Sequence, residues 1–131
     1  MSVTELWQAI GYKMLNTEAI TDIVSTRIHH GRIPEDAWGE PVINYFEVAN
    51  PNTRDGAVEC PVYQISCRSK DPGQVQELAQ VVAQTFHLMQ ESVNGFAVQD
   101  AHFQNKQLLF DPDVQMHHVP VELRFIIEAG G

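Results

Sequence analysis

Histidines are the residues of this chain best suited to hold a metal ion or to move a proton, and the sequence contains six of them. Four form two adjacent pairs, His29-His30 and His117-His118, each in a segment with an extended pattern. Neighbouring residues on a strand point to opposite faces, so a pair offers at most one ligand to a single site. The chain also lacks the H-E-x-x-H and C-x-x-C spacings of common metal sites. We therefore expect no metal centre, and one alternative stays open: a site to which two strands each contribute one histidine.

Serine and cysteine nucleophiles are present, but their positions do not favour catalysis. The candidates all fall within one predicted strand: Cys60, Ser66, Cys67 and Ser69. A catalytic serine of the G-x-S-x-G type stands instead on a sharp strand-to-helix turn, and the chain has no such motif. No glycine-rich loop precedes a helix, so a phosphate-binding cofactor site is not predicted either. The acidic clusters at 35–40 and 111–113 fall in predicted turns, and we therefore expect no enzyme and no cofactor.

The two cysteines, Cys60 and Cys67, are expected to be free thiols. They lie on one predicted strand, about 23 Å apart at the rise of a β-strand, whereas a disulfide requires Cα atoms within about 7 Å. Free thiols are typical of a reducing compartment. The N-terminus lacks the basic start and apolar block of a signal peptide, and no apolar run approaches the roughly 20 residues that span a bilayer. We therefore expect a cytoplasmic protein without a membrane segment.

The charge distribution argues against binding to nucleic acid or to anionic membranes. The chain has 8 Lys and Arg residues against 17 Asp and Glu residues, a formal net charge of −9. Phosphate groups attract clustered cations, and only Lys106 and Arg124 lie beyond residue 70. Any positive patch is therefore expected from the first half of the chain: Arg27, Arg32, Arg54, Arg68 or Lys70.

The segment from 59 to 89 organises the predicted fold. Apolar and polar side chains alternate between 59 and 70, which is the pattern of a half-buried strand. Asp71 can then cap a helix, and Pro72 suits its first position, where no N–H is needed. The helix should carry one apolar stripe at steps of three and four residues: Val75, Leu78, Ala79, Val82, Phe86 and Met89. An Asn-Gly pair at 94–95 is expected to end the helical pattern.

Two helices are predicted at the start of the chain. Ser2 and Glu5 have the spacing of a capping box, and apolar residues at helical spacing follow, which predicts a helix from 3 to 15. A second, shorter helix should be capped by residues 16–17 and bury one apolar face: Ala19, Ile20, Ile23 and Val24. A short extended segment at 27–30 is expected to follow it.

Residues 42–49 are predicted to form a strand with apolar groups on both faces, Tyr45 among them. Such a strand is either central in a sheet or covers an interface. It should pair as an antiparallel hairpin with the strand at 59–70. The loop between them, 50–58, is longer than a tight turn and carries Arg54 and Asp55 at its tip. This loop is either a solvated spacer or a contact arm.

Trp38 is the aromatic residue that departs from the core pattern. It lies among acidic residues in a Gly- and Pro-containing loop, 31–41. A loop aromatic either fills a local gap or anchors a partner, and both alternatives stay open.

Strand signals return in the last third of the chain. A strand is predicted at 96–104, followed by a turn at 105–106 and another turn at 111–113. Residues 119–128 then alternate strictly between apolar and mostly polar side chains, which is typical of an antiparallel strand with one solvated face.

These elements predict one α+β domain over residues 1–131: N-terminal helices, an antiparallel β-hairpin, one long helix packed on a mostly antiparallel sheet, and returning C-terminal strands. The strand order is not determined by these patterns. The candidates for contact with a partner are Trp38, Tyr45, Arg54, Asp55 and Arg68.

Three blocks of the sequence resemble the tail-completion, or tail-terminator, family of long-tailed bacteriophages. The first runs from Ile23-Val24 through 27–34, R-I-H-H-G-R-I-P, and resembles the extended segment after the first helices of the family. The second, 41–45, P-V-I-N-Y, is similar to its first hairpin strand. The third, 63–69, Y-Q-I-S-C-R-S, with the helix after it, resembles its second strand and long helix. No catalytic signature belongs to these blocks.

The resemblance implies a small structural virion protein that closes a homo-oligomeric ring, typically of six copies, on the head-proximal end of the tail tube. Its partners would be the tail tube protein and the head connector protein, with DNA passing through the ring channel. It would assemble in the host cytoplasm and then belong to the virion tail. A head–tail connector or minor capsid protein is the neighbouring alternative. A ligand-binding or enzymatic α+β domain is the alternative from another class.

Overall fold

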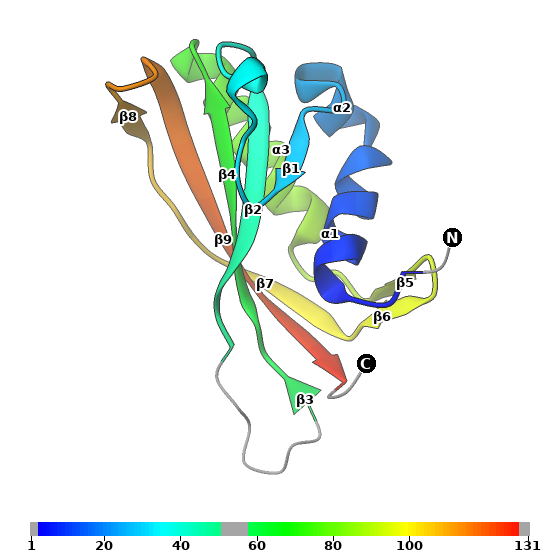
Figure 1. Ribbon diagram of the computed structural model, residues 1–131. Helices are drawn as coiled ribbons and strands as arrows, with labels where there is room; N and C mark the ends of the chain where they lie inside the picture. Colours follow the sequence, from blue (N-terminus) through cyan, green and yellow to red (C-terminus); the bar gives the residue numbers. More distant parts are fainter. Residues whose placement is uncertain (1–2, 51–57, 129–131) are drawn as a thin grey trace.

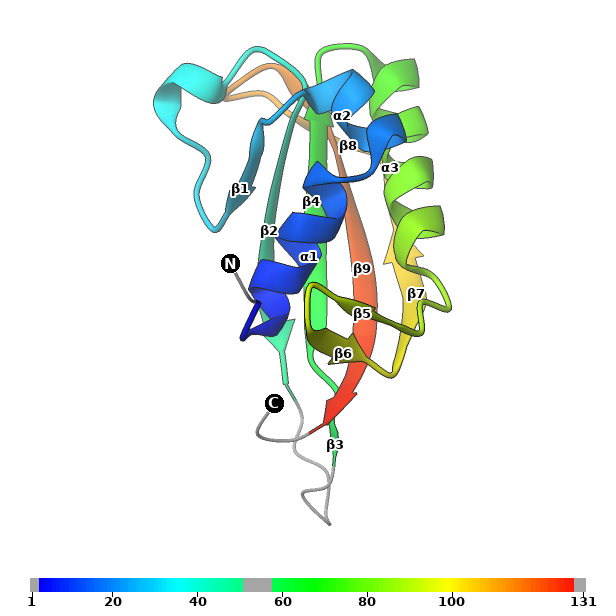
Figure 2. The ribbon, with the colours of Figure 1, turned by 90° about the vertical axis from the view of Figure 1, so that its right-hand side faces the viewer.

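The computed structural model describes residues 3–50 and 58–128. Within these residues, three α-helices pack on one face of a seven-stranded mixed sheet, and a separate two-stranded hairpin lies beside them (Figures 1 and 2). The predicted α+β class is confirmed. None of these helices is long and apolar enough to cross a membrane.

The main sheet is built around one long strand. From one edge, the strand order is β1 (Ile28–His30), β2 (Val42–Ala49), β4 (Val62–Ser69) and β9 (Met116–Glu128). On the other side of β9, two shorter strands pair with successive parts of it: β7 (Asp100–Lys106) and β8 (Leu109–Asp111). The β1–β2 pair is parallel, and the other described pairs are antiparallel. The predicted hairpin of 42–49 with the next strand is the β2–β4 pair, and β2 is a central strand, because β1 covers its other edge.

The strand predicted at 59–70 is in fact two strands. The short β3 (Val58–Glu59) and the longer β4 both pair with β9, and they are separated by Cys60 and Pro61. Pro61 has no N–H to donate to a ladder, although its carbonyl accepts a hydrogen bond from the N–H of Phe125 at 2.8 Å. Cys60 and Pro61 are both buried, so the side-chain alternation predicted for 59–70 is interrupted between the two strands.

The long helix α3 (Pro72–Phe86) begins as its sequence predicts. Asp71 is its N-cap, and the carboxylate accepts a hydrogen bond from the Gly73 N–H at 3.0 Å. Five residues of the predicted stripe are buried in it: Val75, Leu78, Ala79, Val82 and Phe86. Met89 is also buried, but it lies beyond the end of the helix. The chain turns at Leu88, which has a φ of 62° and donates its N–H to Ala101.

The prediction that Asn94-Gly95 ends this helix is wrong. The pair is the turn of a hairpin between β5 (Glu91–Val93) and β6 (Phe96–Val98), with Val93 opposite Phe96. Asn94 and Gly95 have φ values of 47° and 94°. Two positive φ angles in a two-residue loop are the geometry that Asn-Gly favours between antiparallel strands.

The N-terminal helices are α1 (Leu6–Leu15) and α2 (Glu18–Val24). Helix α1 starts later than predicted, because its capping box joins Glu5 at the N-cap to Gln8, whereas Ser2 lies outside the described residues. Helix α2 follows Thr17 as predicted and buries Ile20 and Val24, although Ala19 is exposed. The predicted loop at 31–41 contains a single 3-10 turn, η1 (Glu35–Ala37).

The last third of the chain departs from its prediction at several strand boundaries. The strand expected at 96–104 is divided between β6 and β7, and the expected turn at 105–106 belongs to β7. A register shift between Phe103 and Asn105 lets β7 bend and still follow β9. The turn at 111–113 is confirmed, since the Asp111 carboxylate accepts the Asp113 N–H at 3.1 Å.

Two apolar clusters lie on opposite faces of the sheet. The main core joins the helices to the side of β4 and β9 that includes Ile65, Val121 and Phe125. The strict alternation predicted for β9 is confirmed, because every second residue from Val119 to Ile127 is buried. A small second cluster uses Val42 of β2, which explains why that strand is apolar on both faces.

Candidate interaction site

The structure brings Arg68 and Trp38 together on the sheet face away from the main core. The Arg68 guanidinium carbon lies 5.2 Å from the centre of the Trp38 ring, within the range of a cation–π contact. Trp38 also packs against the small cluster of Ala37, Val42 and Met116. This packing favours the first alternative for Trp38, a loop aromatic that fills a local gap.

Arg68 holds three parts of the chain together. Besides Trp38, its Nη1 lies 3.6 Å from Oδ2 of Asp111, and its Nε donates to Oδ1 of Asn44 at 3.4 Å. Burial lowers the pKa of this guanidinium from its ordinary value, and the Asp111 carboxylate opposes that shift. With 13% of its side chain exposed, Arg68 ties the loop around η1, strand β2 and the turn between β8 and β9 to one another.

His118 pairs with Arg68 across the β4–β9 ladder. Its Nε2 is buried and has no hydrogen-bond partner among the described residues. The pKa of His118 is lowered to about 4, mainly by burial and also by the Arg68 charge, while Asp111 opposes the shift. His118 is therefore neutral in the folded protein at neutral pH.

This arrangement predicts a pH-dependent stability. The pKa of His118 is lowered from 6.5 to about 4 on folding, so the unfolded chain takes up the proton first as the pH falls. The free energy of unfolding should be fully retained above about pH 6.5 and lost progressively towards pH 4. We expect His118→Gln to flatten this slope in denaturant titrations at stepwise pH. Parallel curves for the two proteins would contradict the prediction.

Tyr45 belongs to a different surface. Its side chain is 4% exposed on the helix side of the sheet, and its hydroxyl donates to the Trp7 carbonyl of α1 at 2.9 Å. Burial raises the pKa of Tyr45 to about 12, so the hydroxyl keeps its proton as a donor. Arg54 and Asp55 lie outside the described residues. Of the candidate contact residues, the structure thus brings together Arg68 and Trp38, and it places Tyr45 elsewhere.

Tyr45 forms the floor of an apolar groove along α1, which we call the α1 groove. The groove has a volume of about 520 Å³, and its main lining residues are Val3, Trp7, Gly11, Tyr12, Leu15 and Tyr45. The Trp7 ring stacks on His30 with 4.4 Å between ring centres. Because Tyr45 and Trp7 are both held by other contacts, the groove exists without a ligand.

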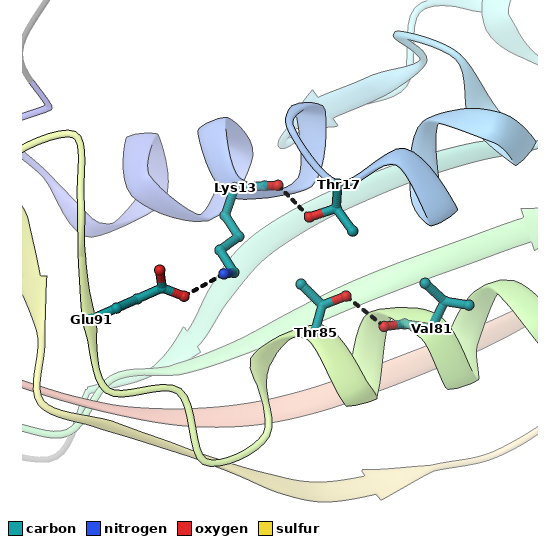
Figure 3. A network of polar contacts seen from close by, with 5 residues as sticks. All are labelled: Lys13, Thr17, Val81, Thr85 and Glu91. Atoms are coloured by element: carbon teal, nitrogen blue, oxygen red, sulfur yellow. Dashed lines mark hydrogen bonds and ion pairs between the residues drawn. The ribbon is translucent and has the colours of Figure 1, made fainter.

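The hairpin β5–β6 closes one end of the α1 groove. Lys13 of α1 forms an ion pair with Glu91 of β5 (Figure 3), and the Val3 N–H donates to the Asn94 carbonyl at 3.2 Å. The same view shows the Thr17 hydroxyl donating to the Lys13 carbonyl at 2.7 Å beyond the last turn of α1. These contacts fix the helix and the hairpin relative to each other.

The sequence contains a pattern that predicts this groove, but the apolar stripe of α1 that faces the core makes the pattern hard to recognise. Trp7, Gly11 and Leu15 recur at steps of four, which places them on one face of α1, and Val3 lies four residues earlier, before the helix begins. This second stripe lies beside the buried one, and Tyr12 and Leu15 are each 44% exposed. A helix with two apolar stripes can bury one in the core and leave the other for contact with a partner or a ligand.

A second exposed apolar surface lies at the other edge of the sheet. Leu108, Leu109 and Phe110 are consecutive and 45%, 41% and 54% exposed. We call this segment the β8 edge, since Leu109 and Phe110 belong to β8, which pairs with β9 on one side only among the described strands. A run of exposed apolar residues is unfavourable unless it has a function.

The structure brings no cluster of three or more His, Cys, Asp or Glu side chains together for a metal ion within residues 3–50 and 58–128. Asp100 and His102 form a pair, with Nε2 of the histidine 3.0 Å from Oδ2 of the aspartate.

We expect two free thiols that react slowly in the folded protein. Cys60 and Cys67 are both buried and unpaired. Burial also raises the pKa of Cys67 well above its ordinary value, which leaves little reactive thiolate. In non-reducing buffer, a thiol reagent should react slowly with native protein and fully with both cysteines after unfolding, and elemental analysis should find no stoichiometric zinc. Missing thiols after unfolding, or one equivalent of zinc, would contradict this expectation.

Comparisons with known proteins identify a family for this chain and two solved structures with a similar fold. The family model described as tail completion protein gp17 matches residues 8–128. A solved chain from the virion of a native gene transfer agent (GTA) particle has the same fold, with a TM-score of 0.78, 14% sequence identity and 94% of each chain covered. A second solved structure, whose description states no function, has a TM-score of 0.61 at 12% identity and covers 94% of this chain and 96% of its own. No curated protein sequence matches the chain. Since the family model covers nearly the whole sequence, the chain belongs to the tail completion protein gp17 family, a family of structural proteins of the bacteriophage tail.

Proposed function

We propose that this protein closes a homo-oligomeric ring of six copies on the head-proximal end of the tail tube. There it ends tail growth and offers a surface to the head connector protein. The observation that carries the proposal is the family match over residues 8–128. The protein would assemble in the host cytoplasm and remain in the virion tail.

Two properties of the chain support this role. The α1 groove and the β8 edge are exposed apolar surfaces of the kind that mediate contacts between proteins. The net charge of −9 favours passage of DNA through a channel over its retention there. A role at the connector or in the capsid would use the same surfaces and differs in the partner. The α1 groove also favours a second candidate, a domain that binds a small apolar ligand, because its volume is in the range of ligand pockets.

The experiment is a mass measurement of the free protein followed by electron microscopy of purified tail tubes incubated with it. The proposal predicts added density at one end of each tube and tubes that no longer elongate when tube protein is supplied. Binding to tail-less heads instead of tubes would favour the connector role. Absence of binding to either structure, together with a bound small molecule in the purified protein, would favour the ligand-binding role.

The loop at 50–58 is part of this proposal as a contact arm. Arg54→Glu should leave the melting temperature nearly unchanged, because a charge in a solvated loop, as the sequence predicts for residue 54, contributes little to stability. If the arm meets a neighbouring copy or the tube, the variant should fail to cap tubes, and infectious particles should fall in complementation. A folded variant that caps and complements normally would make the loop a spacer.

A further inference from the structure

We propose that copies of this chain associate head to tail, with the β8 edge of one copy seated in the α1 groove of the next. This inference rests on the proposed ring, and it names the surfaces that would form the contact between subunits. It commits the α1 groove to a second copy of the chain.

The β8 edge has the composition of a contact segment. Leu109 and Phe110 are neighbours on the edge strand β8 and point to opposite faces of it, so the sheet of a single copy cannot bury both, and Leu108 directly precedes the strand. Phe110 is 54% exposed although it contacts the His117 ring, with 5.1 Å between ring centres. An aromatic side chain held by a neighbouring ring is a suitable anchor for a pocket.

The α1 groove has the properties of the matching pocket. It is formed before any partner arrives, since Tyr45 is fixed by its hydrogen bond to the Trp7 carbonyl, and Trp7 by its stacking on His30. Gly11 lets α1 lie close to Tyr45, because a Cβ at this position would overlap the Tyr45 hydroxyl. A preformed groove lowers the entropic cost of association.

The charges around the two surfaces are complementary. Glu5 and Glu47 both raise the pKa of Tyr63, after the larger effect of its burial, so each of the two carboxylates lies within electrostatic range of the Tyr63 ring. Glu5 accepts a hydrogen bond from the Trp7 ring at the groove, and within the described residues neither carboxylate has a cationic partner. Lys106 lies two residues before the β8 edge and forms no ion pair with any of the residues that the structure describes. Docking would bring Lys106 towards Glu5 beside the groove and would favour one orientation.

The positions of the two surfaces determine the type of assembly. The β8 edge lies on the far side of β9, whereas the groove lies along α1 beside β2, with β4 between β2 and β9 (Figure 1). A contact between two different surfaces on opposite edges is heterologous. Such contacts repeat from copy to copy and close into a ring when the rotation between copies allows it.

The test uses one variant for each surface and a matched control. Phe110→Glu disables the β8 edge, and Leu15→Arg disables the groove. Leu88→Glu introduces a charge at an equally exposed apolar position away from both, since Leu88 is 59% exposed after α3. All three should keep the wild-type melting temperature, because none of these side chains is buried. The mass of each free protein is measured in solution. Ring formation on tail tubes is observed by electron microscopy.

We expect Phe110→Glu and Leu15→Arg each to raise the concentration needed for assembly at least about 30-fold, as loss of an interface hot spot does. Leu88→Glu should assemble like the wild type. The decisive sample is an equimolar mixture of the two disabled variants. The intact groove of Phe110→Glu can accept the intact edge of Leu15→Arg, so the mixture should form a one-to-one dimer and no ring.

Several results would overturn the inference, and they are distinguishable from failure of the proposed function. If both variants form rings on tubes as the wild type does, the ring stands and these surfaces are not its contact. If the mixture forms no dimer, these surfaces are not the contact between subunits. If Leu15→Arg still oligomerises but no longer binds tubes, the groove is assigned to the tube protein. If wild-type protein forms no oligomer either free or on tubes, the proposed ring and this inference both fail.

Discussion

Replacing Phe86 with alanine is expected to lower the free energy of unfolding by about 3–5 kcal/mol. Phe86 is fully buried in the last turn of α3 and meets the Phe125 ring of β9 edge-on, with 5.8 Å between ring centres. Truncation removes contacts from both the helix and the central strand and leaves a cavity between them. The measurement is a denaturant titration of both proteins at one pH, compared by midpoint and slope.

Gln84→Ala is the matched control for this variant. Gln84 lies on the same helix two residues earlier, and its side chain is exposed. Its truncation should change the free energy of unfolding by less than about 0.5 kcal/mol. Similar losses for the two variants would mean that α3 buries a different face from the one described.

Gly11→Ala is expected to destabilise the protein by about 1–2 kcal/mol, although alanine favours a helix interior more than glycine does. A Cβ at this position of α1 would overlap the Tyr45 hydroxyl and approach the ring carbon that carries it to 3.3 Å. Tyr45 is 4% exposed and cannot move aside without losing its hydrogen bond to the Trp7 carbonyl. The strain should therefore exceed the gain in helix propensity.

The cause can be separated from general helix effects by a second substitution. Tyr45→Phe alone should cost about 1–2 kcal/mol, because it leaves the Trp7 carbonyl without this donor. In that background Gly11→Ala should become neutral or stabilising, since the overlapping hydroxyl is gone and the propensity gain remains. A double-mutant cycle measures this coupling. An equal cost of Gly11→Ala in both backgrounds would show that the Tyr45 hydroxyl is not what the methyl group meets.

Local sequence patterns correctly predicted the helices and strands whose structure depends on residues close together in the chain. The stripe of α3, its Asp71 cap and the strict alternation of β9 are each determined by neighbours within a few residues, and these predictions are confirmed. Asn94-Gly95 shows the limit of such patterns, because the same pair ends helices and turns hairpins. The deciding contact is the one between β5 and β6, which local spacing does not contain.

By itself, the sequence determined an acidic α+β domain, the helix-on-sheet nucleus and the resemblance to tail-completion proteins. Only the tertiary structure decided which surfaces are free to meet a partner. The contact of Arg68 with Trp38 and the α1 groove each join segments distant in the chain, and the exposed β8 edge depends on which strand stands at the end of the sheet. The physical reason is that exposure depends on what the rest of the chain covers. Tyr12 and Leu15 of α1 and the run at 108–110 look like core residues in the sequence, and only the finished packing leaves them exposed.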